Sequence, residues 1–180
     1  MPLLRWCPER ALPPYSYVPG LFPHPFSDPS GHCYGQANTF ASTANIAWTE
    51  QPLLLFGIDL FNHGYYWEAH EAWEAVWNLV GRSGTPADFV KGLIKLAAAG
   101  VKAREGRSAG VVRHATRARA LFQQVAATQP REDQYAGFSL SSLLAFAQAI
   151  ETNAVELIDV SSSPVVRIFS QPLERSPSSA

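Results

Sequence analysis

The chain has 180 residues, of which 47% are hydrophobic, 12% aromatic and 16% charged. This length suits one ordinary core plus extensions, and the apolar content excludes disorder across the whole chain. Its 14 Lys and Arg nearly balance 15 Asp and Glu, which excludes the global positive charge typical of polyanion-binding proteins.

Targeting and redox features point to the cytoplasm. The start MPLLRWCPER lacks the apolar run of a secretory signal, because charged residues and a proline interrupt it. The longest uncharged apolar stretch, residues 53–58, falls far short of the ~20 residues of a membrane span. Cys7 and Cys33 have no CxxC spacing, so neither a disulfide framework nor a cysteine zinc site is indicated. We therefore expect a cytoplasmic protein that does not engage a membrane.

Prolines dominate the N-terminal part of the chain. Eight of the 14 fall within the first 29 residues, where their fixed φ and missing amide donors exclude helix and central strand. The aromatic residues between them make the segment too apolar for a solvated linker. We expect residues 1–48 to form an ordered arm packed on the body. A proline-rich ligand for a partner's aromatic groove is the alternative.

Helical periodicity and capping residues predict about five helices within residues 49–160. The first covers 52–62 and ends or kinks at His63-Gly64. The second covers 65–80 and the third runs to about 105, with Thr85 as N-cap and Pro86 at its first position. One apolar stripe is expected on the second: Tyr66, Ala69, Trp73, Val76, Trp77 and Val80.

The last two helices follow the same pattern. The fourth covers 108–127, buries Val112 and exposes Arg113 and Arg117. The fifth begins at a cap on Ser139 or Ser141 and runs through 159, with Val155 and Ile158 on its apolar side. Residues 161–180 form a polar tail, with room for a short strand at 165–169. The sequence thus predicts an all-α fold, a compact bundle without a central sheet and with a proline-rich N-terminal arm.

Residues 61–77, FNHGYYWEAHEAWEAVW, hold the candidate site. On a helical wheel Trp67, His70, Glu71 and Glu74 fall within about 100° of arc, beside the apolar stripe. An imidazole and a carboxylate four residues apart project from successive turns, which lets one helix supply two ligands to a metal. Further ligands would come from these candidates: Glu71, His63, His114, Asp88, His24 and His32.

Structural roles also explain these residues. His70 can hydrogen-bond Glu74 or a neighbouring carbonyl and seat the helix. Asn62 and His63 are turn residues that can cap the second helix. Glu68, on another face, is expected in solvent, and Trp77 is expected to fill core volume rather than cover a ligand pocket.

The same segment, followed by FVKGLIKLAAAGVKAREG and a basic helix, resembles the DUF309 family of small helical proteins of uncharacterised function. The likeness covers about residues 55–125 and rests on the pattern N-x-G-x-F/Y-x-E-x-H-E-x-x-E. It implies a helical fold and a motif H-x-x-x-E-x-x-W/Y, suggested for that family to bind metal, at His70, Glu74 and Trp77. The likeness extends to Asn62, Gly64, Glu68 and Glu71. It supplies no substrate, and the arm lies outside it.

Charge is unevenly distributed. Residues 50–81 carry five acidic and no basic side chains, whereas residues 89–119 carry eight basic and one acidic. We expect a solvated basic face with some ion pairs to the acidic helix. An anion or nucleic-acid surface is the alternative. Nucleic acid is not favoured, because no aromatic residues are interleaved with the basic ones.

The leading hypothesis is a helical bundle that binds a divalent metal through His70 and Glu74, with Glu71 as ligand or as base. Imidazole and carboxylate donors suit zinc, manganese or iron, and a metal-dependent hydrolase acting on an ester, amide or phosphate is the simplest activity. The alternative is a non-enzymatic interaction module in which the His/Glu motif braces the bundle. A homo-oligomer is compatible with both.

Overall fold

A computed structural model of the chain describes residues 3–36 and 45–177. Five α-helices dominate it: α1 Pro52–Asn62, α2 Tyr66–Leu79, α3 Gly84–Arg104, α4 Ser108–Thr128 and α5 Leu140–Thr152. A short 3-10 helix, η1 Trp48–Glu50, precedes α1. The strands β1 Gln134–Tyr135 and β2 Phe138–Ser139 pair antiparallel between α4 and α5. The predicted all-α class is confirmed. Positions 1–2 and 37–44 of the expected arm and 178–180 of the expected tail lie outside the described residues.

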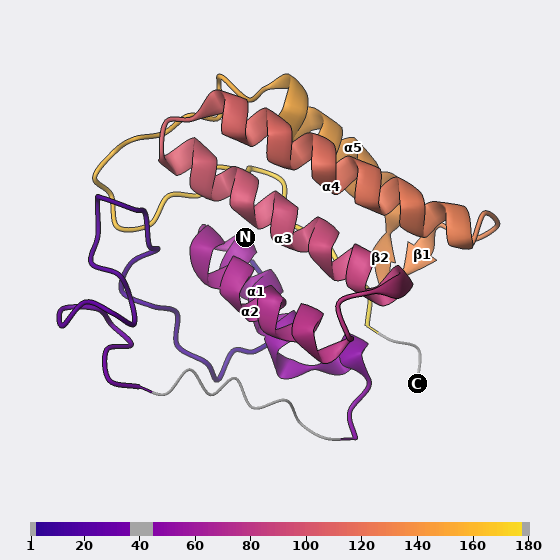
Figure 1. Cartoon of the computed structure of the whole chain (residues 1–180), viewed down its shortest axis with the longest axis horizontal. Helices are drawn as coiled ribbons and strands as arrows, with labels where there is room; N and C mark the ends of the chain where they lie inside the picture. Colours follow the sequence, from indigo (N-terminus) through magenta and orange to yellow (C-terminus); the bar gives the residue numbers. More distant parts are fainter. Residues whose placement is uncertain (1–2, 37–44, 178–180) are drawn as a thin grey trace.

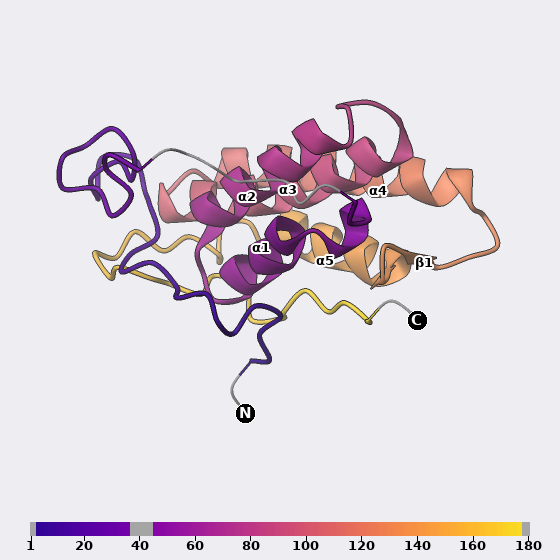
Figure 2. The same ribbon diagram turned by 90° about the horizontal axis from the view of Figure 1, so that it is seen from below.

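The helices form two layers. Each helix packs on the next along the chain, and α3, α4 and α5 alternate in direction (Figure 1). Seen from below, α2, α3 and α4 make one layer, with α1 and α5 in the other (Figure 2). Within the described part of the chain, no helix is both long and apolar enough to cross a bilayer.

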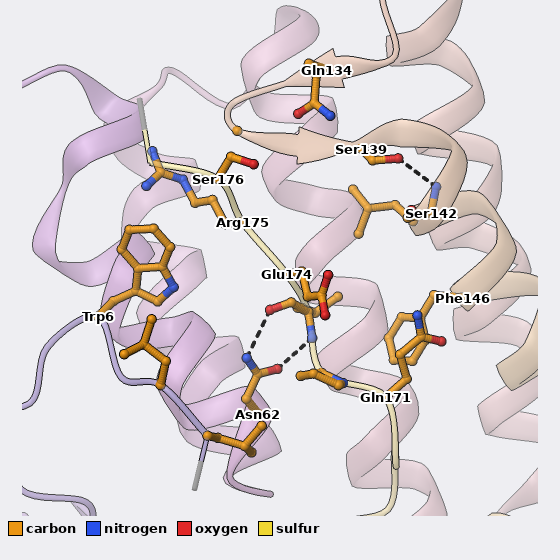
Figure 3. A pocket seen from close by; sticks show the side chains of 16 residues that line it. Trp6, Asn62, Gln134, Ser139, Ser142, Phe146, Gln171, Glu174, Arg175 and Ser176 are labelled. Carbon is orange, nitrogen blue, oxygen red and sulfur yellow. Dashed lines mark hydrogen bonds between the residues drawn. The ribbon is translucent and has the colours of Figure 1, made fainter. Parts of the chain in front are cut away.

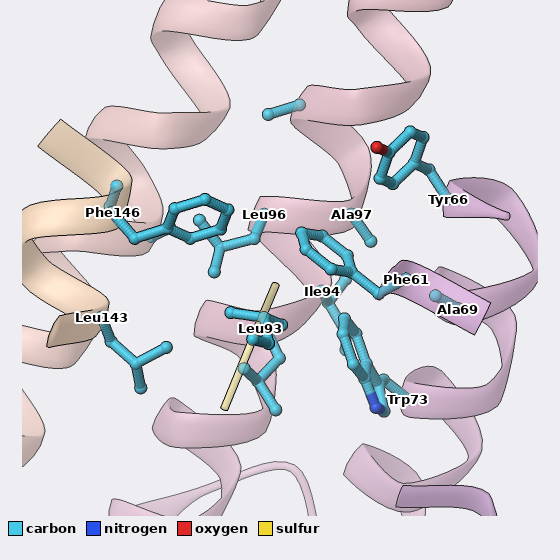
Figure 4. Packing of buried hydrophobic residues seen from close by; sticks show 14 of the residues in the cluster. Phe61, Tyr66, Ala69, Trp73, Leu93, Ile94, Leu96, Ala97, Leu143 and Phe146 are labelled. Carbon is cyan, nitrogen blue, oxygen red and sulfur yellow. The ribbon is translucent and has the colours of Figure 1, made fainter. Parts of the chain in front are cut away.

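The core lies between these layers. Phe61 of α1, Trp73 of α2, Leu93 of α3 and Phe146 of α5 converge there (Figure 4), and all four are buried. A Cβ on Gly57 would lie 2.2 Å from Nε1 of Trp73, so glycine is what lets the indole pack against α1. This burial of large apolar side chains supplies the main stabilisation of the bundle.

Gly64 closes the turn between α1 and α2. Its φ of +91° lies in the left-handed region that glycine favours. A Cβ there would also come within 2.6 Å of the Val166 carbonyl oxygen. Two separate constraints therefore explain this glycine of the sequence pattern, and the predicted break at His63-Gly64 is confirmed.

Five local predictions are wrong. Helix α3 has Ser83 as N-cap, so Thr85 lies inside its first turn. Val112 is exposed, because the register of α4 turns Val111 to the core instead. Helix α5 is capped by Ser139 as predicted but ends at Thr152, where the Asn153 side chain bonds the Ala149 carbonyl. Val155 is therefore exposed. The structure assigns no strand to residues 165–169.

The C-terminal segment, residues 160–177, runs in extended form against the bundle. Phe169 is buried and stacks on Phe61 with ring centroids 5.5 Å apart. The Tyr66 hydroxyl accepts hydrogen bonds from the backbone N–H groups of Ile168 at 2.8 Å and Phe169 at 3.1 Å. Burial raises the pKa of Tyr66 to about 12. One tyrosine of α2 therefore holds two backbone groups of this segment.

The described part of the arm, residues 3–36, meets the bundle at two buried carboxylates. Asp59 of α1 accepts the backbone N–H groups of Trp6 and Cys7, each at 2.8 Å. Glu68 of α2 accepts hydrogen bonds from Ser16 and Tyr17. Both carboxylates fix the path of the arm. The division of the chain into arm, helical domain and tail stays a prediction.

Candidate metal centre

Helix α2 places His70, Glu71 and Glu74 together. One donor atom from each of these side chains lies within 4.8 Å of the other two. They belong to one and a half turns of a single helix, so the spacing of the chain alone brings them to the same side. His70 and Glu71 are about a quarter exposed, and Glu74 is exposed.

The closest pair in this group is His70 with Glu71. Nδ1 of His70 lies 3.4 Å from Oε1 of Glu71. That nitrogen is buried and forms no hydrogen bond with any described residue. A buried polar atom left in this state costs about 1–3 kcal/mol. The helix-seating hydrogen bond of the structural alternative is thus not made by this atom.

The geometry of the group fits a metal ion. Zinc bonds to nitrogen and oxygen of about 2.1 Å in a tetrahedral site place neighbouring donors about 3.4 Å apart, which is the separation of the His70 and Glu71 donors. The Glu74 carboxylate has to move closer, and as an exposed side chain it is free to rotate. Three protein ligands would leave a fourth position open, as in catalytic zinc sites.

Lys95 of α3 and His114 of α4 interact electrostatically with members of this group. Burial lowers the pKa of Lys95, and the neighbouring Lys91 and Arg117 lower it further, while Glu74 opposes the change. Burial also lowers the pKa of His114 to about 4, with Lys95 as the next cause and His70 as a smaller one. The His114 imidazole is therefore neutral at pH 7, and it lies close enough to His70 for the two rings to interact electrostatically.

The other proposed ligands lie elsewhere in the described part of the chain. His63 bonds the Asp59 carbonyl oxygen at 2.7 Å through Nδ1, and His24 packs against the Trp67 ring at 5.4 Å. His32 contacts Cys33 and Glu68. Neither Asp88 nor His114 belongs to the group of three.

Glu68 is not in solvent, so that prediction was wrong. Its side chain is 8% exposed. Its carboxylate accepts a hydrogen bond from the Ser16 hydroxyl at 3.0 Å and another from the Tyr17 backbone N–H at 2.8 Å. The helical wheel missed this because the arm, and not the bundle, covers that face of α2.

Asn62 does not cap α2, which is a second correction. It is the last residue of α1 and is buried, and the N-cap residue of α2 is Tyr65, without a side-chain bond. The Asn62 amide donates to the Leu173 carbonyl at 3.0 Å and accepts the Leu173 backbone N–H at 2.8 Å (Figure 3). This reciprocal pair imitates one rung of a β-ladder.

Trp77 lies at the rim of the core. It is partly buried and packs against the core cluster, as a volume-filling residue does. Arg82 and Lys91 approach its ring, at 5.3 Å and 5.2 Å from the centroid. Such cation–π contacts are worth about 0.5–1 kcal/mol at exposed sites. The indole thus joins the end of α2 to the basic side of α3.

The structure also contains a hollow that none of the three candidate metal ligands lines. Its volume is about 640 Å³, and it opens between the N-terminal residues, the start of α5 and the C-terminal segment (Figure 3). Trp6, Asn62, Ser139 and Arg175 are among its lining residues, and it includes none of the three candidate ligands. The candidate metal centre is therefore separate from it.

Comparison with known proteins identifies part of the chain. Residues 54–114 match the family model of DUF309, a domain of unknown function. This matched stretch is called the DUF309 segment below. The DUF309 segment includes most of α1, all of α2 and α3 and the first turns of α4, and thus all three candidate ligands. The arm, α5 and the C-terminal segment lie outside it. No curated protein matches the chain.

Proposed function

We propose that the DUF309 segment binds a divalent metal ion through His70, Glu71 and Glu74. The observation that carries this proposal is the buried Nδ1 of His70, which has no hydrogen-bond partner among the described residues and lies 3.4 Å from the Glu71 carboxylate. A metal ion would satisfy this nitrogen and offset the repulsion between two neighbouring carboxylates. Zinc, manganese and iron suit this donor set.

The activity we propose is metal-dependent hydrolysis of an ester, amide or phosphate. When bound at such a centre, a divalent ion polarises the substrate and acidifies water. With His70 and Glu74 on the ion, Glu71, which is about a quarter exposed beside His70, is the carboxylate that would take a proton from that water. Lys95, which is electrostatically coupled to Glu74, would attract an anionic part of the substrate. We also propose that the protein is cytoplasmic, since the free thiols of Cys7 and Cys33 suit a reducing compartment.

Metal content tests this proposal directly. Protein purified without a metal-binding tag should contain nearly one ion per chain, and His70→Ala and Glu74→Ala should each lower that content. Glu156→Ala, which removes an exposed carboxylate outside the group, is the matched control and should leave the content unchanged. Full metal content in both site variants would rule out these ligands.

The second candidate is an interaction module in which the motif only braces α2. The 3.4 Å approach of His70 to Glu71 favours it, since a protonated imidazole would form an ion pair there. In that case His70→Ala would destabilise the protein by only about 1 kcal/mol, and a chelator would not change wild-type melting. Under metal binding, chelation instead removes the stabilisation that a bound ion gives to the folded state.

A further inference from the structure

The arm brings a second set of reactive side chains to α2, on the side of Glu68. Sγ of Cys33 lies 3.2 Å from Nδ1 of His32. On the other side of the ring, Nε2 of His32 lies 3.9 Å from Oε1 of Glu68. The imidazole thus stands between a thiol and a carboxylate, which is the arrangement of nucleophile, base and orienting group in covalent catalysis.

The imidazole and the carboxylate are both held in place. The His32 side chain is 11% exposed, and its Nε2 is buried without a hydrogen-bond partner in the described ranges. The edge of the His32 ring meets the Tyr15 ring with centroids 4.7 Å apart. Glu68 is fixed by its two hydrogen bonds to Ser16 and Tyr17. Such fixed geometry lowers the entropic cost of reaction.

A small apolar cavity adjoins these groups. Its volume is about 120 Å³, and His32, Cys33 and Glu68 form part of its wall. The remaining lining is mostly aromatic and aliphatic, including Phe26, Phe56, Leu60 and Trp67. An apolar cavity of this size suits a short aliphatic chain and no charged group. Its position beside the thiol would seat such a chain next to the nucleophile.

We propose that Cys33 is a nucleophile with His32 as its general base, that Glu68 positions His32, and that the site hydrolyses neutral esters of short aliphatic acids. Burial, and then the charge of Glu68, raises the pKa of the Cys33 thiol. The thiol is therefore protonated at neutral pH, and a base has to remove its proton as sulfur attacks. Nδ1 of His32 is within reach to do so.

The reaction takes place in two balanced steps. In the first, the thiol proton moves to Nδ1 of His32, sulfur bonds to the acyl carbon, and the ester C–O bond breaks to release the alcohol with that proton. In the second, water gives a proton to His32 and attacks the thioester carbon. The C–S bond breaks, Cys33 regains the proton, and the carboxylic acid leaves.

The carboxylates explain why the substrate is neutral. Glu68 and Glu71 both line the cavity, so an anionic substrate would be repelled, and the carboxylate product would be expelled for the same reason. Glu71 also belongs to the candidate metal centre. The thiol reaction uses no ion, so a chelator distinguishes the two sites.

The test uses the full chain and p-nitrophenyl butyrate. The expected result is a rapid release of p-nitrophenol, equivalent to one per chain, with one butyryl group on Cys33 found by peptide mass mapping. Cys33→Ala should abolish both signals. Cys7→Ala is the matched control, because Cys7 is buried against the Pro52 carbonyl, away from the cavity, and it should react like the wild type.

His32 and Glu68 are tested by rates. His32→Asn should slow acylation about 100-fold or more, the usual contribution of a general base. Glu68→Gln should lower kcat and leave KM and the melting temperature unchanged, since glutamine can still bond Ser16 and Tyr17. Acetyl and butyryl esters should react, and decanoyl esters should not.

Four results would overturn the proposal: a label on another residue, an unchanged rate in His32→Asn, a rate no faster than that of the same thiol in urea, or loss of acylation with a chelator. If Cys33→Ala does not fold, wild-type protein whose Cys33 has been alkylated replaces it. Release of p-nitrophenol from the alkylated protein at the wild-type rate would equally refute the proposal.

Discussion

Tyr66→Phe removes a single oxygen and tests how the C-terminal segment is held. Two backbone N–H groups, of Ile168 and Phe169, lose their acceptor, at 2.8 and 3.1 Å. A buried donor left without a partner costs about 1–3 kcal/mol. Because Ile168 is only partly buried, water can recover part of its loss. We therefore expect the free energy of unfolding to fall by about 2–4 kcal/mol, while the aromatic packing stays.

Equilibrium unfolding in urea measures this change. The midpoint should fall with an unchanged m-value, and the amides of Ile168 and Phe169 should exchange hydrogen faster. Tyr65→Phe, which removes the hydroxyl of the adjacent tyrosine, is the control and should change stability by less than about 0.5 kcal/mol. A Tyr66→Phe variant as stable as the control, with both amides still protected, would refute the reasoning.

The raised pKa of Tyr66 makes the stability of the protein depend on pH. The pKa of Tyr66 is raised from 10 to about 12 in the folded protein. Between these values the folded state keeps a proton that the unfolded state releases. Stability should therefore fall as pH rises through this window, and the fall should be smaller in Tyr66→Phe. Urea unfolding curves of both proteins at pH 9 and pH 11 measure the difference.

Three further predictions concern the DUF309 segment. Chelation should lower the melting temperature of the wild type and leave that of His70→Ala unchanged, and equal shifts in both would contradict metal binding at His70. The pKa of His114 falls from 6.5 to about 4 on folding, so the unfolded state takes up a proton first as pH falls through this window. Stability should decrease there by at most about 3.4 kcal/mol, and by about 1–2 kcal/mol once screening of this half-buried ring is considered. In urea titrations, His114→Gln should lack this decrease. Gly100→Ala places a Cβ 2.4 Å from the Tyr66 ring. Overpacking of about 1–3 kcal/mol should outweigh the higher helix propensity of alanine. Gly110→Ala, whose Cβ would lie 2.9 Å from Cγ of Lys102, should lower the melting temperature less, because a lysine chain shifts more readily than a buried aromatic ring.

The helices were predictable because their signals are local. Pro52 and the break at His63-Gly64 set the predicted range 52–62, and the helix has these bounds. The Ser139 cap was also readable from its position before an apolar run. The end of α5 was not predicted, and its range was too long by several residues. The apolar periodicity continues past Thr152, whereas the helix ends where the Asn153 side chain bonds the Ala149 carbonyl four residues earlier.

The candidate site likewise has residues whose surroundings the sequence predicts and residues whose surroundings it does not. His70, Glu71 and Glu74 share one helix, so their proximity follows from helical geometry. The environments of Asn62 and Glu68 do not, because their partners lie 111 and about 50 positions away. Local rules assigned a turn to Asn62 and solvent to Glu68. A buried carboxylate facing a covering arm leaves no periodic signal in the sequence.

The attachment of the C-terminal segment has a consequence for biosynthesis. Its hydrogen bonds join residues 102 and 111 positions apart. Because a ribosome releases the chain from its N-terminus, α1 and α2 emerge long before the residues that pair with Tyr66 and Asn62. Until then, water has to solvate those polar groups and the surface that Phe169 covers. Contacts of such long sequence separation form late and slowly, so the nascent bundle passes through a stage with this surface open, when chaperones have access to it.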